Sequence, residues 1–424
     1  MDSRRNLTRR DFLRSAGAAA AGFSIVPRHV LGGALFTAPS EEITRAVIGI
    51  GGMGRGHLGF PGARTVAVCD VDQKHIDEVL KGLEKGVTGY RDFREVLARD
   101  DIDVVHIATP PHWHGIISAE AARAGKDIWC EKPMTRTIGE GRKVVEAVQR
   151  YDAMFRLNTW FRFRGDFYGF GTTVQPIKKL VDSGMLGWPL TITVGQATGF
   201  DFKFQWSGRT DLVPEPVPEN LDYDFWLGPA PYKPYHPHRT HGTFRGYWDY
   251  DGGGLGDMGQ HYLDPVQYLL GKDDTSPVRV EVDAPQQHYD AAGEWRRIEM
   301  IYEDGCRIVL DAVNTNSKEI PYIEGPNGKL FRGFESDIPN IQKEVALLPE
   351  PEPQEPDFYQ AVRTRRKFPL NEANGHRSCT LINLGTIALR LGRGFSYDPV
   401  LEESVGDEAV NRLIHQPMRS PWYI

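Results

Sequence analysis

A short apolar run that breaks abruptly into glycines, AVIGIGGMGRG at residues 46–56, limits what this chain can fold into more than any other feature. The apolar residues 43–50 predict a short buried strand. Gly49, Gly51 and Gly54 form a G-x-G-x-x-G pattern before a predicted helix. Such glycines permit a tight strand-to-helix turn, close backbone approach to a pyrophosphate and close packing of the helix on the strand. The stretch therefore predicts a dinucleotide-binding βαβ unit.

A carboxylate ends the second predicted strand, residues 65–70. Asp70 follows Gly49 by about 20 residues, the interval at which an acidic side chain meets the adenosine ribose hydroxyls. A carboxylate there repels an added 2′-phosphate, so Asp70 predicts NAD, with NADP less favoured. Asp70 could instead cap the following helix, and the two roles are compatible.

Predicted strands and helices keep alternating as far as Thr159. The strands are 103–108, 127–130 and 154–159, and the helices are 73–85, 113–124 and 138–150. This spacing predicts βαβ units in a doubly wound parallel sheet, whose ligands bind beyond the carboxyl ends of the strands. The expected cofactor-binding residues are Gly49, Gly51, Gly52, Met53, Gly54, Asp70, Thr109, Pro110, His114, Glu131 and Lys132.

Extended segments and aromatic loops replace this alternation beyond Thr159. Segments 190–197 and 278–284 and a hairpin over 296–313 predict an open, mostly antiparallel sheet. One helix is predicted at 379–392.

Two further motifs, CEKPMTRT at 130–137 and GGGLGDMGQHYLD at 252–264, follow the strand–glycine–helix opening in this order. Together they resemble the signatures of the Gfo/Idh/MocA oxidoreductases, and the resemblance runs from about residue 41 to the end. It implies an α/β enzyme that uses NAD(P) on sugars, cyclitols or their derivatives. We expect a Rossmann domain at 41–160, a substrate-binding and oligomerisation α+β domain at 161–424, and a homo-oligomer.

The resemblance also implies three catalytic residues. Lys132 would lie near the reacting carbon, where an ammonium stabilises charge developing on the substrate oxygen. Asp257 and His261 share a face of one predicted helix. In the family the matching histidine is the base and the aspartate orients it. The alternatives are a surface lysine, a helix-capping aspartate and a packed polar histidine.

Other histidines and aromatic residues keep two interpretations each. His112 and His114 have no partner identifiable from sequence and are equally compatible with lining the site and with a structural role. In segment 221–250, Trp226 and Trp248 could stack on a sugar face, or the segment could be a packed loop or an oligomer contact. Its candidate hydroxyl-binding residues are His236, His238 and Arg239.

Neither a metal site nor essential disulfides are expected. The four cysteines show no paired short spacing, and no further ligand accompanies the histidines at a convincing interval. The formal net charge of −7 implies no broad cationic surface, so nucleic acid is not an expected partner.

The first 40 residues are predicted to be a signal and linker rather than part of the fold. Arg9 and Arg10 precede a short, weakly apolar segment, which resembles a Tat (twin-arginine) export signal. The apolar run is too short for a membrane span. We therefore expect the Tat machinery to export the folded chain to the periplasm or another extracytoplasmic compartment, without a stable transmembrane anchor. The alternative is a basic amphipathic start.

These features favour an exported NAD-dependent oxidoreductase that transfers hydride between a sugar or cyclitol hydroxyl and a retained cofactor. An alternative is a glycosidase that uses bound NAD transiently, by oxidation, elimination, water addition and re-reduction. Glycosidases in this family are expected to lack the E-K-P lysine, so Lys132 favours net oxidoreduction. A third possibility is a non-catalytic sugar- or nucleotide-binding protein, against which Lys132, Asp257 and His261 argue.

Overall fold

Six parallel strands form the first sheet, in the order β3-β2-β1-β4-β5-β6. The computed structural model describes residues 42–159, 161–163, 165–168 and 170–424, and the predicted export signal lies outside them. The strands are β1 (Thr44–Ile48), β2 (Arg64–Cys69), β3 (Thr88–Tyr90), β4 (Val104–Ile107), β5 (Asp127–Cys130) and β6 (Phe155–Leu157). The strand order reverses direction between β1 and β4, and this confirms the predicted doubly wound sheet.

Helices connect these strands as crossovers. They are α3 (Gly52–Leu58), α4 (Gln73–Leu80), α5 (Phe93–Leu97), η1 (Pro111–Trp113), α6 (His114–Arg123) and α7 (Ile138–Arg150). The helix α7 has its predicted bounds, because the Thr137 side chain accepts a hydrogen bond from the Glu140 N–H at its start. The helix α4 ends before its predicted end, where Gly82 follows its C-cap Lys81. The short β3 and α5 were not predicted.

The second sheet has eight strands in the order β13-β12-β11-β7-β10-β9-β8-β14. They are β7 (Thr191–Gly195), β8 (Arg279–Asp283), β9 (Arg297–Ile301), β10 (Arg307–Asp311), β11 (Ile323–Gly325), β12 (Gly328–Phe331), β13 (Glu335–Ser336) and β14 (Phe395–Ser396). Strands β7 and β10 pair in parallel and the other pairs are antiparallel, which confirms the mostly antiparallel sheet. The predicted hairpin is β9–β10.

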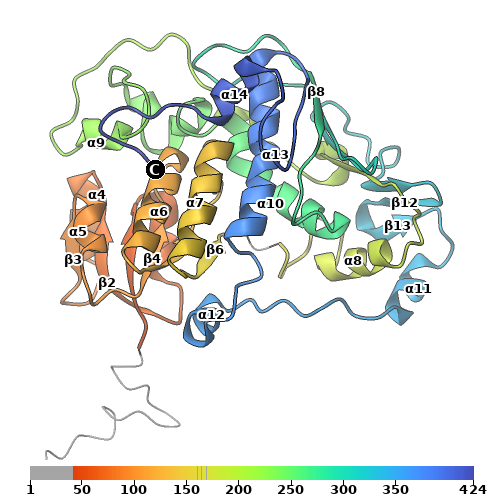
Figure 1. Ribbon diagram of the computed structural model, residues 1–424, viewed down its shortest axis with the longest axis horizontal. Coiled ribbons are helices and arrows are strands. Elements are labelled where there is room, and N and C mark those ends of the chain that lie inside the picture. The colour runs from red at the N-terminus through yellow and green to blue at the C-terminus, as the bar shows by residue number, and fades with distance from the viewer. Residues whose placement is uncertain (1–41, 160, 164, 169) are drawn as a thin grey trace, which may run out of the picture. The chain divides into compact units, whose positions relative to one another are not determined.

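The remaining helices are α8 (Val174–Asp182), α9 (Tyr223–Leu227), α10 (Gly253–Leu270), α11 (Ile341–Leu347), α12 (Phe358–Thr364), α13 (Glu372–Leu391) and α14 (Glu408–Ile414). The 3₁₀ turns are η2 (Gln196–Thr198), η3 (Phe204–Trp206), η4 (Pro237–Arg239), η5 (His241–Gly246) and η6 (Arg332–Phe334). The helix α13 starts earlier than predicted because the Asn371 side chain caps it. It packs on both α7 and α10, which joins the helices of the two sheets (Figure 1).

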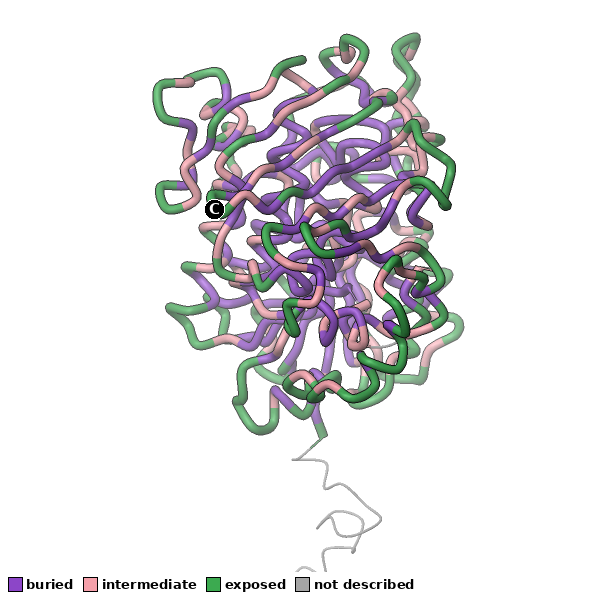
Figure 2. The backbone as a smooth tube through the Cα atoms, turned by 90° about the vertical axis from the view of Figure 1, so that its right-hand side faces the viewer, coloured by how far each residue is buried: buried purple, intermediate pink, exposed green. Residues whose placement is uncertain are grey.

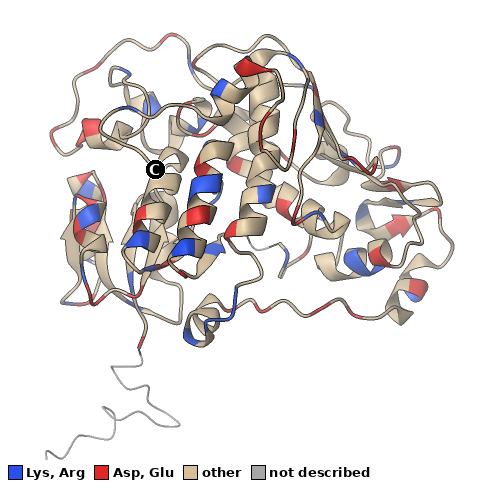
Figure 3. Ribbon diagram, viewed as in Figure 1, with Lys and Arg blue, Asp and Glu red and all other residues tan. Residues whose placement is uncertain are grey.

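Buried segments run through the interior and exposed segments are mostly loops (Figure 2). Acidic and basic residues are interspersed along the visible helices rather than separated by sign (Figure 3). Among the described residues, no helix combines the length and the apolar character needed to cross a membrane.

The turn between β1 and α3 contains two glycines at which a Cβ would clash with the neighbouring backbone. A Cβ on Gly49, whose φ is +82°, would lie 2.6 Å from the backbone nitrogen of Thr109. A Cβ on Gly54 would lie 1.8 Å from the carbonyl oxygen of Gly49. These contacts set α3 directly against the end of β1. The packing requirement predicted for Gly54 is therefore visible in the structure.

We expect Gly54→Ala to destabilise the protein by roughly 1–3 kcal/mol or more, because the new methyl group forces the β1–α3 turn apart. Gly56→Ala is the matched control, because Gly56 lies in the same helix and a Cβ there meets nothing within 4 Å. That control should be neutral or slightly stabilising. Thermal unfolding of both variants checks the prediction, and an unchanged Tm in Gly54→Ala would contradict it.

Candidate active site

A cavity of about 530 Å³ lies at the carboxyl ends of the parallel strands. The loops after β1, β2, β4 and β5 form one wall, and Trp226, Phe244 and Asp251 are among the residues of the opposite wall. The predicted cofactor-binding residues on the wall are Gly49, Gly51, Gly52, Met53, Asp70, Thr109, Pro110, Glu131 and Lys132. Among the described residues, Gly54 and His114 lie behind this wall. Parallel sheets bind their ligands at this edge.

The glycine-rich turn leaves its backbone open to the cavity. A Cβ on Gly52 would meet no atom within 4 Å, and one on Gly51 would meet only a ring atom of His75, at 4.0 Å. Side chains at these positions would therefore project into open space above the turn. A pyrophosphate needs that approach to backbone N–H groups, so the turn fits a dinucleotide such as NAD.

Asp70 connects the end of β2 to the glycine-rich turn. Its Oδ2 accepts a hydrogen bond from the Ile50 N–H at 2.9 Å, and its Oδ1 accepts one from the Asp72 N–H at 2.9 Å. The cap of α4 is Asp72, whose Oδ1 accepts from the Lys74 N–H, so the alternative capping role falls to Asp72. Asp70 lines the cavity at its Rossmann end, where the predicted ribose contact would form.

Lys132 and Asp257 form a buried ion pair between the two sheets. The Lys132 Nζ donates to Asp257 Oδ1 at 2.9 Å and to the Asp257 carbonyl oxygen at 2.8 Å. The Arg245 Nε also donates to Asp257 Oδ1, at 2.8 Å. Burial alone would raise the pKa of Asp257, but the charges of Lys132 and Arg245 outweigh it and lower that pKa. Asp257 is therefore an anion that positions two cations at the cavity wall.

Asp251, which the sequence analysis did not single out, is a second carboxyl on this wall. Burial and the neighbouring charge of Asp257 raise its pKa to about 8, against the opposing effect of Lys132. Its Oδ1 has no hydrogen-bond partner among the described residues. Asp251 directly precedes the glycines that start α10, a position typical of ordinary helix caps, so the sequence signal was ambiguous.

His261 lies one turn beyond Asp257 on α10 and is buried. Its ring meets that of Phe161 edge-on, with the centroids 5.8 Å apart. Burial, with a smaller contribution from the charge of Lys132, lowers the pKa of His261 to about 3. The imidazole is therefore neutral at physiological pH. The hydrogen bonds described for Asp257 run to Lys132 and Arg245, and the predicted orienting of His261 by Asp257 stays a prediction.

Glu131 fixes the backbone that carries Lys132. Its Oε1 accepts from Asn158 Nδ2 at 2.6 Å and lies 2.8 Å from His57 Nε2, while its Oε2 accepts from the Lys132 N–H at 3.2 Å. Burial favours the neutral acid, but these partners outweigh it and lower the pKa of Glu131 to about 2. The glutamate is thus a buried anion that anchors the strand end.

His112 and His114, for which the sequence left two interpretations, contact backbone carbonyl groups of loops behind the cavity wall. His112 Nε2 lies 3.0 Å from the Trp226 carbonyl oxygen. The His114 ring bridges two wall loops, with Nδ1 at 2.7 Å from the Pro133 carbonyl oxygen and Nε2 at 2.8 Å from that of Thr109. Burial lowers the pKa of both residues. Their geometry is that of structural histidines.

Of the residues singled out in the aromatic segment, only Trp226 lies on the cavity wall. Trp248 is in the core of the second sheet and donates from Nε1 to the His288 carbonyl oxygen. The three candidate hydroxyl-binding residues pair with protein groups: His236 with Glu215, His238 with Tyr247, and Arg239 with Asp290. Instead, η5 brings His241, Phe244 and Arg245 to the cavity.

Two family models match the chain. The model described as the NAD-binding Rossmann fold of an oxidoreductase family, Gfo/Idh/MocA, matches residues 43–159. The model described as the C-terminal alpha/beta domain of that oxidoreductase family matches residues 170–424. The first match confirms NAD as the predicted cofactor.

Named relatives match over shorter stretches. A glycosyl hydrolase family 109 protein of Shewanella baltica (strain OS195) is 32% identical over an alignment of 172 residues, and the match covers 34% of this chain and 38% of that protein. An alpha-N-acetylgalactosaminidase of Shewanella oneidensis is 30% identical over 172 residues, with the same shares. The chain thus spans about 38% of the length of these curated relatives.

Solved structures share the fold at low sequence identity. The WlbA dehydrogenase of Chromobacterium violaceum, determined in complex with NADH and UDP-GlcNAcA, is 18% identical, with a TM-score of 0.58. The match covers 84% of this chain and 96% of that one.

Replacing the carboxylate of Asp257 or of Asp251 by an amide should change the stability of the protein to very different extents. Asp257→Asn removes the anion between two cations and should cost up to about 3–5 kcal/mol at neutral pH. Asp251→Asn should be tolerated, because Asp251 is itself mostly neutral there. Because folding raises the pKa of Asp251, the protonated carboxyl contributes to the stability of the folded protein. This contribution is complete below the ordinary carboxyl pKa of about 4 and is lost as the pH rises to about 8.

Relative to the unsubstituted protein, Asp251→Asn should therefore gain Tm as the pH rises through that window. Thermal unfolding of both variants across the pH range provides the measurement. A difference in Tm between Asp251→Asn and the unsubstituted protein that does not change with pH would show that Asp251 titrates normally.

Proposed function

The chain belongs to the Gfo/Idh/MocA oxidoreductase family, and we propose that it transfers hydride between a hydroxyl-bearing carbon of a sugar or cyclitol and tightly bound NAD. The observation that carries this proposal is the Lys132–Asp257–Arg245 arrangement on the wall of the NAD cavity. An ammonium held there by a carboxylate is placed to bind the oxygen of a substrate carbinol. Asp70 at the Rossmann end favours NAD over NADP, because it would repel a 2′-phosphate.

The proposed chemistry divides between charge stabilisation and proton transfer. Bound NAD supplies the hydride acceptor. The Lys132 ammonium stabilises negative charge on the substrate oxygen as its proton leaves. We assign the acceptance of that proton to His261, whose imidazole burial keeps neutral. The low pKa makes it a weak base, which the Lys132 ammonium offsets by making the substrate hydroxyl more acidic. A second carbonyl substrate, reduced at the same site, would return the retained cofactor to NAD.

A second candidate, an NAD-dependent glycosidase, is favoured by the names of the Shewanella relatives. That reaction begins with the same oxidation and ends with re-reduction, so it also needs bound NAD. The presence of Lys132 in the E-K-P motif is the feature that favours net oxidoreduction.

One experiment separates these functions. The purified protein is analysed by mass spectrometry for bound cofactor and then incubated with panels of free sugars, cyclitols and aryl glycosides. We expect copurified NAD and substrate-dependent NADH absorbance without aglycone release. Aglycone release without accumulated NADH would identify the glycosidase, and a protein that binds sugars without either signal would be a binding protein.

His261→Ala should lower turnover by roughly 10²–10⁴, the usual scale of general-base catalysis, because the hydroxyl proton loses its acceptor. NAD occupancy should survive, since His261 belongs to α10 and lies outside the Rossmann sheet. Steady-state kinetics and the NAD content of the purified variant give the two readouts. Near-normal turnover with full NAD occupancy would make Asp251 or Lys132 the leading candidate for the proton acceptor.

Export of the folded chain is proposed from the sequence of residues 8–26. The Tat route would carry NAD out with the protein, which suits a site that retains its cofactor. Replacing Arg9 and Arg10 together by lysine should leave the precursor in the cytoplasm, as cell fractionation would reveal. Undiminished export of that variant would reject the Tat interpretation.

A further inference from the structure

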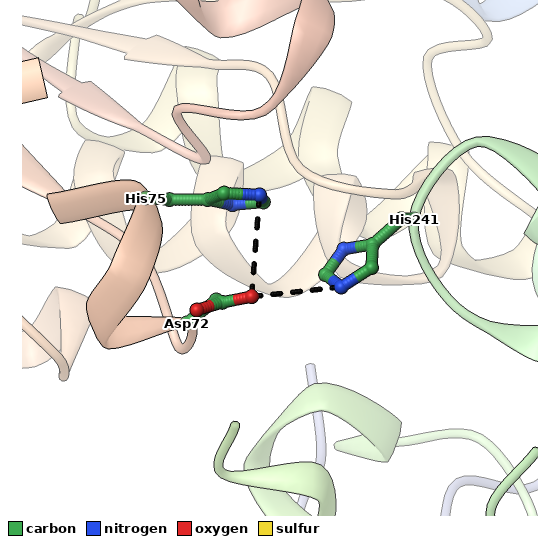
Figure 4. Close-up of side chains that lie close together, drawn as sticks. All are labelled: Asp72, His75 and His241. Atoms are coloured by element: carbon green, nitrogen blue, oxygen red, sulfur yellow. Dashed lines mark ion pairs between the residues drawn. The ribbon is translucent and has the colours of Figure 1, made fainter. Parts of the chain in front are cut away.

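Three side chains of metal-ligating type meet at the Asp70 end of the cavity. Asp72 caps α4, His75 lies in the first turn of that helix, and His241 begins η5. One ligand atom of each lies within 4.8 Å of those of the other two. Figure 4 shows both imidazole rings facing the same oxygen of the Asp72 carboxylate.

The separations suit a shared ion better than direct hydrogen bonds. Asp72 Oδ2 lies 3.5 Å from His241 Nε2 and 4.0 Å from His75 Nε2. Good hydrogen bonds between such atoms are roughly 2.7–3.2 Å long. Ligand atoms bound about 2.0–2.2 Å from one tetrahedral Zn²⁺ stand roughly 3.3–3.6 Å apart. The three ligand atoms lie within 4.8 Å of one another, so closing movements of up to roughly 1–1.5 Å would bring all three onto one ion.

A second layer of hydrogen bonds orients two of the ligands. Asp72 Oδ1 accepts from the Lys74 N–H at 2.9 Å and from Asn220 Nδ2 at 2.6 Å, which leaves Oδ2 directed at the imidazoles. His75 Nδ1 lies 3.2 Å from Asp70 Oδ2. A carboxylate on one ring nitrogen places the proton there and leaves the other nitrogen as a donor of its lone pair to a metal.

We propose that Asp72, His75 and His241 bind one divalent transition-metal ion, for which Zn²⁺ is the best match. Two imidazoles and one carboxylate form a three-ligand zinc set whose fourth position can hold water. Imidazole ligands favour zinc over magnesium or calcium, which prefer oxygen. No metal was expected from the sequence, because no further ligand follows the histidines at a convincing interval; here the third ligand comes from a distant part of the chain.

The ion would fix the start of η5 to the Rossmann sheet, with water at its fourth position. The same turn carries Arg245, whose Nε donates to Asp257 Oδ1. Bound zinc would therefore hold Arg245 beside the Lys132–Asp257 pair. No redox or covalent step is involved, and the binding site does not depend on the identity of the substrate.

The test uses the untagged full chain, stripped of metal by dialysis against a chelator and titrated with Zn²⁺ by calorimetry. We expect one ion per chain and an increase in Tm on zinc addition. Co²⁺ should give the visible absorption of a tetrahedral complex. His241→Ala and His75→Ala should each weaken binding by at least about 10–100-fold and abolish the zinc-dependent rise in Tm.

His415→Ala is the matched control. His415 Nε2 also lies 3.5 Å from a carboxylate, that of Glu403, and the His415 side chain is 42% exposed against 47% for His241. It is not part of the three-ligand group, so its loss should leave zinc binding unchanged. Absence of zinc binding by the unsubstituted chain, or equal binding by folded His241→Ala and His75→Ala, would overturn the proposal and indicate a cluster bridged by water.

Discussion

The ion pair between Lys132 and Asp257 determines how the rest of the site is arranged. Lys132 follows a strand of the parallel sheet, and Asp257 lies on α10 beside the antiparallel sheet, so the pair can form only when both sheets are in place. Burial, together with the charge that Asp257 keeps to hold the lysine, raises the pKa of the nearby Asp251 and favours its neutral form. Glu131 also anchors the lysine, because its carboxylate accepts a hydrogen bond from the backbone N–H of Lys132. Two adjacent carboxyls thus differ in protonation because only one of them faces the cations directly.

A second consequence is that hydrogen bonds of Gln260, besides the ion pair, connect the two sheets. Gln260, on α10, accepts from the Met134 N–H beyond the E-K-P motif and donates to the Gly375 carbonyl oxygen on α13. Together with the ion pair, these bonds fix the motif loop against two helices of the other sheet. An amide is suited to this position because it donates and accepts at once.

Local sequence patterns predicted the parallel sheet well because apolar runs, glycines and caps act over a few residues. The same patterns missed β3 and the strands β11–β14, which are too short to show periodicity. Helical spacing correctly placed Asp257 near His261, but it could not show that Lys132 and Arg245 would take the carboxylate. Asp72, His75 and His241 were equally invisible, because their meeting depends on how η5 folds back over the first sheet. Contacts within a segment were predictable, and contacts between distant segments needed the tertiary structure.

The six residues of η5 reach both ends of the cavity, with His241 beside the Asp70 loop and Arg245 beside Asp257. A substitution that reshapes the Asp70 end to accept another nucleotide will therefore disturb the reacting centre through this short turn. Under the proposed function, cofactor preference and turnover would be epistatic traits in this scaffold. Laboratory evolution toward NADP would then need changes both in the loop after β2 and in η5, beyond the Rossmann half.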